Sequence, residues 1–514
     1  MAQTPVLIAG AGPTGLVLAL WLKRFGVAVR IVDRTAEPGT TSRALAVQVR
    51  TLELYRQLGF AQDVVEAGVR VENLNLWVRG KRRAHVPIAR IGGDLSPYPF
   101  ALVYPQDAHE KLLIEKLGAE GVAVERRTEL LGFEQSPEGV RARLRRPDGS
   151  EEVGEFSYLA GCDGASSTVR TSIGVGFPGG TYTGYFYVAD VQASGPSIDG
   201  ELHVDLDEAD FLLMFPLKGK GRARLVGVLH DEHRRDNGSA REDLTFADVG
   251  QRAIRNLNLH VENVNWFSTY RVHHRVAEHF RDRRVFLLGD AAHIHSPVGG
   301  QGMNTGIGDA VNLAWKLAAV VRREAREDLL ATYEPERIAF ARRLVATTDR
   351  LFTFVTKEGG LARTVRTRVV PIVIPWLFRF AAIRRFLFRT VSQIGVAYPK
   401  STLSEGSAGR VRGGDRLPWV PAGPEPDNFA PLASMKWQVH LYGEARSDVA
   451  HACAELGLPM HVFPWRAETL RAGLARDALY LIRPDGYVAL ADSRADPARL
   501  QRYSEERSCK ISIP

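Results

Sequence analysis

The sequence predicts an α/β protein, because three apolar segments typical of buried parallel strands each run directly into glycine. The three junctions are VLIAGAGPTG at 6–15, SYLAGCDGASSTVR at 157–170 and RRVFLLGDAAH at 283–293. The last junction continues into an amphipathic helical pattern that reaches Leu317. Glycine in regular structure makes folding less favourable by about 0.5–1 kcal/mol relative to alanine. Glycine at three strand ends therefore indicates that the backbone there must come very close to other atoms, with no room for side chains.

The first junction has the form of a dinucleotide-binding turn. Its GAGPTG lies between the strand pattern at 6–9 and a helical pattern, and a second apolar run follows at 29–32. Gly10 permits a tight turn, Gly12 lets the backbone approach a pyrophosphate, and Gly15 lets helix and strand pack closely. Pro13 and Thr14 stand between them, where the helix N-terminus supplies amide donors. The motif does not distinguish FAD from NAD.

Asp33 ends the second apolar run, 18 positions after Gly15 (33 − 15), and Arg34 follows it. A carboxylate at this place can accept hydrogen bonds from an adenosine ribose, and its charge repels a 2′-phosphate. In isolation Asp33 would be interpreted as a solvated residue at a strand end. The glycine motif before it favours the binding role, so we include Asp33 and Arg34 in the cofactor site.

The other two junctions place an aspartate directly after an apolar strand. Asp163 follows the second strand, and Gly289 and Asp290 follow the third. Such a carboxylate is well placed to hydrogen-bond a chain of sugar-like hydroxyls. For Asp163 alone, capping of a helix is the alternative.

These motifs, together with SRALAVQVRTLEL (42–54), YPQDAHEKLL (104–113) and GDAAHIHSPVGGQGMNTGIGDAVNLAWKL (289–317), resemble the FAD-dependent aromatic hydroxylases, which are single-component class A flavoprotein monooxygenases. The resemblance covers nearly the whole chain and is closer to the longer members, the phenol hydroxylase-like and aromatic polyketide hydroxylase-like proteins. It implies a Rossmann-like FAD-binding domain with an inserted, mostly antiparallel β substrate domain and a C-terminal thioredoxin-like domain.

The resemblance also implies a role for each candidate residue. Around the FAD pyrophosphate, ribose and ribityl chain it places Gly10, Gly12, Gly15, Asp33, Arg43, Gln106, Gly289 and Asp290. It associates Asp163, in the family's DG motif, with the binding of both FAD and NAD(P)H. Along the isoalloxazine ring it places the loop from Pro297 to Asn304, in which Gly299, Gly300 and Gly302 let the backbone come into contact and Met303 and Asn304 present backbone to the pyrimidine edge. The following helix N-terminus would favour the anionic reduced flavin.

The implied reaction uses NADPH or NADH as a transient reductant and O₂ as the oxidant. Oxygen adds at flavin C4a, and the resulting hydroperoxide hydroxylates a phenolic or polycyclic, polyketide-like aromatic substrate. The alternatives are hydroxylating inactivation of an aromatic antibiotic, Baeyer–Villiger-type oxygenation, and a non-catalytic flavin-fold binding protein. The WxWxIP stretch of flavin halogenases is absent from the sequence. No residue is assigned as a general base.

We expect the FAD-binding domain over 1–175 and 271–345, the substrate domain over 176–270, a helical segment over 346–400 and the thioredoxin-like domain over 401–514. The last lacks a redox cysteine pair, so we interpret it as a packing or dimerisation module. Candidate walls of the substrate cavity are aromatic residues of the inserted domain, with core packing as the alternative for each. They are Tyr185, Tyr187, Phe211 and Phe215.

Charge and composition exclude several other classes of function. The formal net charge is +8, but arginines occur mainly in pairs on expected helices, which indicates solvated helix faces rather than a nucleic-acid interface. Three cysteines without a CxxC motif favour a reducing, cytoplasmic location. His293 and His295 lack metal-ligand partners at suitable spacing, so we predict no metal site. The oligomeric state is left open between monomer and homodimer.

One apolar stretch, VVPIVIPWLF at 369–378, is too short to span a bilayer. We therefore predict no membrane span. We expect this stretch to pack against the protein, with docking on a membrane or covering a hydrophobic ligand as the alternatives.

Overall fold

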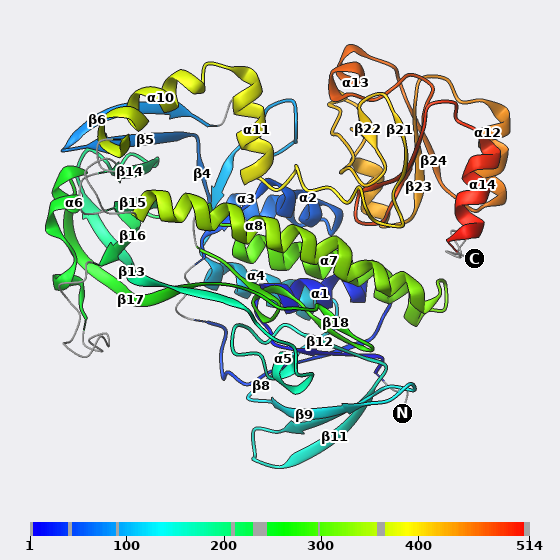
Figure 1. The fold of residues 1–514 in the computed structure, drawn as a ribbon, viewed down its shortest axis with the longest axis horizontal. Coiled ribbons are helices and arrows are strands. Elements are labelled where there is room, and N and C mark those ends of the chain that lie inside the picture. The colour runs from blue at the N-terminus through cyan, green and yellow to red at the C-terminus, as the bar shows by residue number, and fades with distance from the viewer. Residues whose placement is uncertain are drawn as a thin grey trace.

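The computed structural model describes residues 4–39, 44–88, 92–206, 211–229, 244–296, 299–356 and 365–507. In this part of the chain, strands form two six-stranded sheets, one eight-stranded sheet and two three-stranded sheets. Helices α1 (Pro13–Arg24) and α7 (Gly302–Val321) pack against each other at the centre of the molecule (Figure 1). The helices between residues 370 and 391 and the region after residue 400 lie above them in this view.

The first six-stranded sheet is the parallel α/β sheet that the three junctions predict. Its strand order is β18-β19-β12-β1-β2-β8, with only the edge strand β18 antiparallel. Every residue of β1 is buried, as expected for a parallel strand covered on both faces. The strands are β1 (Val6–Ala9), β2 (Val29–Asp33), β8 (Val124–Arg126), β12 (Tyr158–Gly161), β18 (Arg281–Asp282) and β19 (Val285–Leu287).

Helices α1 and α7 and the parallel sheet form the main apolar core, to which further helices and two three-stranded sheets add side chains. The helices are α2 (Val49–Gln57), α3 (Ala61–Ala67), α4 (Gln106–Ala119) and α5 (Thr168–Ser172). One small sheet joins β3 (Ala46–Val47), β7 (Ala101–Val103) and β4 (Val69–Val71), and the other joins β11 (Glu151–Phe156), β10 (Val140–Arg145) and β9 (Glu129–Gln135).

The eight-stranded sheet contains the predicted inserted strands but is larger than the range 176–270 assigned to it. Its order is β20-β17-β13-β16-β15-β14-β5-β6, all antiparallel except for the β14–β5 pair. The strands β5 (Asn73–Val78) and β6 (Lys81–Pro87) come from the range assigned to the FAD-binding domain. The others are β13 (Gly179–Ser194), β14 (Leu202–Leu206), β15 (Phe211–Pro216), β16 (Arg222–Leu229), β17 (His260–Val276) and β20 (His293–Ile294).

The short helix α6 (Gln251–Asn256) covers one face of this sheet, where alternate side chains of β13, β15 and β16 form an apolar cluster. The hairpin β5–β6 joins the sheet because β5 pairs in parallel with β14, with Leu76 opposite Val204. Pairing between distant segments leaves no local trace in the sequence, which explains why the range 1–175 did not separate the hairpin from the rest.

Helices dominate the described residues between Tyr333 and Val391, which are 333–356 and 365–391. They are α8 (Tyr333–Thr356), a π-helical turn (Val365–Val369), α10 (Val370–Leu377) and α11 (Ala381–Val391). Beyond them the second six-stranded sheet has the order β22-β21-β26-β25-β23-β24. Its strands are β21 (Glu405–Ala408), β22 (Val411–Arg412), β23 (Gln438–Tyr442), β24 (Met460–Phe463), β25 (Leu479–Ile482) and β26 (Val488–Asp492).

The chain order of this C-terminal region contains the expected strand-helix-strand unit followed by two strands and a helix. Helix α12 (Ser447–Glu455) joins the parallel pair β23 and β24, and β25 and β26 form the expected hairpin around 483–487. Helix α13 (Ala467–Ala472) precedes the hairpin and α14 (Pro497–Glu506) follows it. Part of the range 401–514 thus forms a separate sheet beside the core.

Candidate functional site

The glycine turn after β1 is shaped by two close backbone approaches and one open space. A Cβ at Gly10 would lie 2.3 Å from the carbonyl oxygen of Cys162, and Gly10 has φ +102°. A Cβ at Gly15 would lie 2.0 Å from the carbonyl oxygen of Gly10. By contrast, a Cβ at Gly12 would meet no atom within 4 Å. Gly10 and Gly15 are therefore required by packing, whereas Gly12 borders open space at the start of α1.

Asp33 lies beside this turn and holds it. Its Oδ2 accepts a hydrogen bond from Ala11 N at 2.7 Å, and its Oδ1 accepts one from Thr35 N at 2.8 Å. A cavity of about 240 Å³ opens there, lined among others by Gly10, Asp33, Arg34 and Asp163. Residues of the first two junctions thus line one cavity.

Asp163 also stabilises the start of a helix, which was the alternative to a binding role. Its Oδ1 accepts a hydrogen bond from Ser167 Oγ at 2.5 Å, and its Oδ2 accepts one from Val169 N at 3.1 Å. Ser167 is itself the N-cap of α5. Burial raises the pKa of Asp163, and these hydrogen bonds oppose the rise. The carboxylate is held rigidly at the wall of the cavity that it shares with Asp33.

The third junction reaches the first through Thr14. A Cβ at Gly289 would lie 2.7 Å from Thr14 Oγ1, and a Cβ at Gly306 would lie 2.3 Å from the same atom. Gly289 has φ +57° and begins a 3₁₀ turn that carries Asp290, which is exposed. The start of α1, the turn after β19 and the first turns of α7 therefore converge on one place.

The segment before α7 packs closely against residues 44–51. A Cβ at Gly300 would lie 2.6 Å from Ala46 Cβ, and Gly300 has φ +61°. Gly302 is the first residue of α7. The side chain of Asn304 is buried and accepts hydrogen bonds from Gln48 N and Thr51 Oγ1, each at 2.8 Å.

Asn304 completes this contact by donating to the carbonyl oxygens of Ala46 at 2.8 Å and Gly300 at 2.9 Å. All four hydrogen-bonding positions of its amide are used, so its side chain clamps the loop. Met303 beside it is partly buried against the main core.

Two buried polar atoms just before this loop have no hydrogen-bond partner within the described residues. They are Nε2 of His295 and Oγ of Ser296. Nδ1 of His295 donates to the carbonyl oxygen of Ser296 at 2.8 Å, and burial lowers the pKa of His295 to about 4. The imidazole is therefore neutral at pH 7, and its free Nε2 is an acceptor. Buried polar atoms are rarely left unpaired, and a polar ligand atom placed beside these two could pair with them.

Behind the site, Asp309 joins the third junction to helix α8. Its carboxylate accepts hydrogen bonds from Gly289 N at 3.0 Å, from His293 Nε2 at 2.7 Å and from Arg337 Nε at 2.6 Å. Burial alone would raise the pKa of Asp309, but Arg337 and His293 outweigh it and lower the pKa. His293 is thus a structural residue. No group of three or more metal-ligating side chains is found in the described ranges.

Gln106 lies at the start of α4, where its backbone N donates to the carbonyl oxygen of Ala44 at 3.0 Å. Its side chain donates to Glu110 Oε1 at 2.7 Å, and Glu110 in turn accepts from Gly39 N. This brings Gln106 next to the 44–48 segment that contacts the α7 loop. Arg43 and Pro297, also predicted for the site, lie outside the described residues.

The residues present fit an FAD molecule. An open space over Gly12, a cavity between Asp33 and Asp163, and unpartnered acceptors beside α7 follow one another along the convergent junctions. The N-termini of α1 and α7 supply the positive ends of two helix dipoles, which suit a pyrophosphate and an anionic ring edge.

Several residues of the site were not predicted individually. Asp309 lies in the quoted 289–317 block, and its position one helical turn after Thr305 could have indicated an inward-facing side chain. Arg337 carries no sequence signal, because a buried arginine cannot be told from a solvated one on a helix. Gln48 binds through its backbone N and through Nε2, which donates to the carbonyl oxygen of Gly299 at 2.9 Å.

Comparison with known proteins agrees with this geometry. Residues 3–348 match the family described as FAD binding domain. The chain is 37% identical over 418 residues to the 6-methylpretetramide 4-monooxygenase of Streptomyces rimosus, covering 79% of this chain and 72% of the relative. It is 32% identical over 375 residues to the pentachlorophenol 4-monooxygenase of Sphingobium chlorophenolicum, covering 72% of this chain and 68% of the relative.

Among solved structures, the anhydrotetracycline hydroxylase OxyS from Streptomyces rimosus superimposes with a TM-score of 0.78 at 28% identity, covering 99% of both chains. The family match extends over more than half of the sequence, and the structural likeness extends over nearly all of it. On this basis the chain belongs to the FAD-dependent aromatic hydroxylases and is an FAD- and NAD(P)H-dependent aromatic monooxygenase.

Proposed function

We propose that the chain hydroxylates a phenolic or polycyclic aromatic compound of the polyketide type. The observation that carries the proposal is the convergent flavin cradle, combined with relatives whose names give a pretetramide and a chlorinated phenol as substrates. Bound FAD would supply the oxygen-transfer chemistry, reduced by NADPH or NADH. The protein's own part is to bind, orient and exclude water.

The proposed site residues divide this work between them. Gly10, Gly12 and Gly15 would bring backbone to the pyrophosphate, Asp33 would hold the ribose side, and Asn304 would fix the ring-facing loop through the hydrogen bonds described above. Arg34, Gln106, Asp163, Gly289 and Asp290 would complete the dinucleotide site, since they lie on the same junctions or beside them. We keep Arg43 and Pro297 in this site on the resemblance alone.

The substrate would bind on the face of the eight-stranded sheet opposite α6. Phe215 lies on this face, in a small apolar cluster with Leu45 next to the segment that contacts Gly300. Phe186 and Tyr270 pair across β13 and β17, with ring centroids 5.9 Å apart, in another cluster. Tyr187, by contrast, stacks on Phe267 in the α6-side core, so core packing is its role.

Of the remaining candidate walls, the side chains of Tyr185 and Phe211 lie outside the described set. We propose that 401–514 form a thioredoxin-like unit that packs on the FAD-binding domain. We also propose that the chain acts in the cytoplasm, as a monomer or a homodimer. The structure describes no helix that is long and apolar enough to cross a membrane.

A direct test is to purify the chain, add FAD and record visible absorption, and then to measure NADPH and NADH oxidation with oxygen uptake over a panel of monocyclic and polycyclic phenols. We expect flavin absorption bands, oxidation stimulated by some polycyclic phenols, and a product heavier by one oxygen atom in mass spectrometry. A chain that binds FAD but hydroxylates only a finished antibiotic favours the inactivation alternative. A chain that takes up no FAD, or whose NAD(P)H oxidation no aromatic compound stimulates, contradicts the proposal.

A further inference from the structure

Helices α10 and α11 form a separate layer at the outer edge of the eight-stranded sheet. Figure 1 shows α10 above β5 and β6, with α11 following it toward the C-terminal region. The inner face of α10 is packed, because Val370 and Ile374 contact a cluster that includes Leu76 and Val204. The inner side of α11 is also packed, because its Phe388 lies against Gly92. A Cβ added at Gly92 would lie 2.2 Å from the Phe388 ring.

The outer face of this helix pair is apolar and exposed to solvent. Of the ten large hydrophobic side chains that are exposed among the described residues, seven belong to 369–391. Ile372 is 72% exposed, Phe386 68% and Trp376 55%, and the ring of Trp376 stands edge-on to the half-exposed ring of Phe380 at 5.0 Å between centroids. Scattered exposed hydrophobic residues need no explanation, but their concentration on one pair of helices is typical of an interaction surface.

The same segment carries a dense positive charge. Residues 365–400 contain six arginines and one lysine and no aspartate or glutamate, so their formal charge is +7, compared with +8 for the whole chain. Basic residues occur along the entire sequence, but elsewhere acidic residues nearly balance them. Arg379, Arg385 and Arg389 are exposed beside the apolar side chains, and Arg385 forms an ion pair with Asp94.

We propose that α10 and α11 dock this chain on an anionic lipid surface. Helices with exposed aromatic and aliphatic residues flanked by arginine lie in the plane of a membrane interface, where rings enter the acyl boundary and cations meet headgroup phosphates. The absence of a spanning helix in the described ranges agrees with docking rather than insertion. The inference goes beyond the proposed function, because it requires neither FAD nor substrate.

Charge argues against a second copy of this chain as the occupant. In a two-fold symmetric dimer the same patch lies on both sides of the interface, so the exposed arginines Arg379 and Arg389 of one copy would face those of the other. Such a juxtaposition of like charges is unfavourable, whereas an anionic membrane surface attracts both copies equally. The alternative of a covered hydrophobic ligand is also disfavoured, because Ile372, Trp376 and Phe386 are exposed rather than enclosed.

The test is cosedimentation of the full chain with vesicles of phosphatidylglycerol and phosphatidylcholine at low salt, against vesicles of phosphatidylcholine alone. We expect binding to the anionic vesicles that weakens as salt is raised. The triple variant Ile372→Ser, Trp376→Ser, Phe386→Ser should weaken binding at least tenfold, and Arg379→Gln should weaken it about fivefold. All four side chains are exposed, so the variants should keep the wild-type melting temperature.

Matched controls come from other surfaces of the same chain. Leu470→Ser removes a side chain that is 62% exposed on α13, and Arg141→Gln removes an exposed arginine of β10, so neither should change vesicle binding. Failure of the wild-type chain to bind anionic vesicles at low salt overturns the proposal. So does an equal effect of the control and patch variants, or a wild-type dimer that the triple variant converts to a monomer while vesicle binding stays the same.

Discussion

At the scale of single residues, the glycines of the first turn separate the demands of packing from those of ligand binding. A Cβ at Gly15 would overlap backbone, but a Cβ at Gly12 would enter open space. Gly12 has an extended backbone with φ −75°, which any residue can adopt. The two positions therefore have different reasons to be glycine, although the sequence motif treats them alike.

We predict that Gly12→Ala leaves the stability of the FAD-free protein unchanged but weakens FAD binding at least tenfold, because the methyl group occupies the space meant for the pyrophosphate. Gly15→Ala should instead lower the melting temperature of the FAD-free protein. Thermal unfolding and flavin fluorescence titration measure the two effects. Gly118→Ala, on α4, is the control: its Cβ also meets nothing within 4 Å, so it should leave FAD affinity unchanged and should not lower the melting temperature, because alanine is about 0.5–1 kcal/mol more favourable than glycine in a helix. A Gly12→Ala protein with normal FAD affinity would contradict the assignment.

A second residue-scale prediction concerns acid stability. His109 is fully buried, its Nε2 contacts Tyr55 Oη at 2.8 Å, and burial lowers its pKa to about 3. The unfolded chain takes up the proton near the ordinary value of about 6.5, so stability is complete above that pH and falls as the pH drops from 6.5 toward 3. By pH 5 this one group should cost about 2 kcal/mol.

The measurement is the free energy of unfolding between pH 7 and pH 5 for the wild type and for His109→Gln. The variant should lose about 2 kcal/mol less than the wild type over this range. His260→Gln, at an exposed position of β17, should behave as the wild type does. Equal losses in wild type and His109→Gln would show that this histidine does not set the acid limit.

At the scale of elements, the segment before α7 is held against residues 44–51 through Asn304. We predict that Asn304→Ala lowers the free energy of unfolding by about 2–4 kcal/mol, because Gln48 N and Thr51 Oγ1 lose their buried acceptor. FAD affinity should fall as well, since the loop loses its clamp. Chemical denaturation and flavin titration test this, with the exposed Asn263→Ala as control. Unchanged stability and affinity in Asn304→Ala would refute the clamp.

The elements also show what sequence can and cannot predict. The strands β1, β2, β12 and β19 and the helices α1 and α7 carry local patterns, because burial on both faces and the glycine turns fix their residue types. The long strand β17 was not identified, because its buried, intermediate and exposed residues do not alternate regularly. The pairing of β5 with β14 and the contact of Asp309 with Arg337 depend on chain segments far apart, which no local pattern records.

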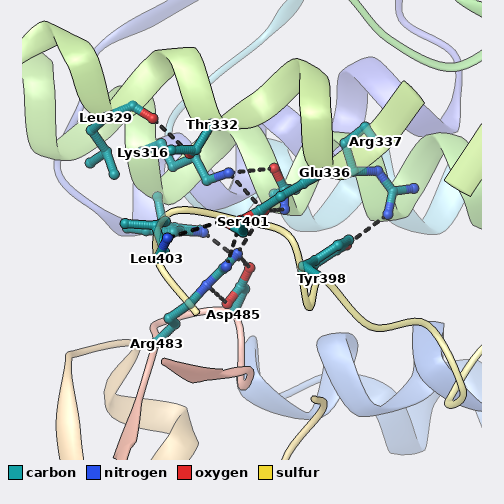
Figure 2. Close-up of polar contacts among 12 residues, drawn as sticks. Lys316, Leu329, Thr332, Glu336, Arg337, Tyr398, Ser401, Leu403, Arg483 and Asp485 are labelled. Carbon is teal, nitrogen blue, oxygen red and sulfur yellow. Dashed lines mark hydrogen bonds and ion pairs between the residues drawn. The ribbon is translucent and has the colours of Figure 1, made fainter. Parts of the chain in front are cut away.

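At the scale of the whole molecule, buried charges join the C-terminal region to the helices behind the flavin site. Figure 2 shows Glu336 of α8 between Lys316 and Arg483, with Asp485 and Ser401 close by. Arg483 donates to Glu336 at 2.8 Å and to Asp485 at 2.6 Å, and Lys316 donates to Glu336 at 2.8 Å. Burial lowers the pKa of Lys316 to about 8, although Glu336 opposes this.

We predict that Arg483→Met lowers the free energy of unfolding by about 3–5 kcal/mol, because the buried carboxylates of Glu336 and Asp485 then lose the guanidinium that neutralises them. Unfolding should also separate into two transitions, the first of which reports the C-terminal region. Calorimetry and denaturant curves measure both effects. Arg446→Met breaks an exposed ion pair with Asp448 and should cost less than about 1 kcal/mol. A single, unshifted transition in Arg483→Met would exclude the network as the link.

The order of strands in the parallel sheet has a consequence for synthesis of the chain. The strand made first, β1, pairs with β12, and β12 pairs with β19, while the loop and helix that close the cofactor cradle end at Val321. At ordinary translation speeds, roughly 15 to 60 seconds separate the emergence of the first turn from that of α7. During this interval α1 can pack on β1, β2 and α4, but the face that packs on α7 stays uncovered. The cradle therefore cannot close on its flavin until translation is well past the midpoint.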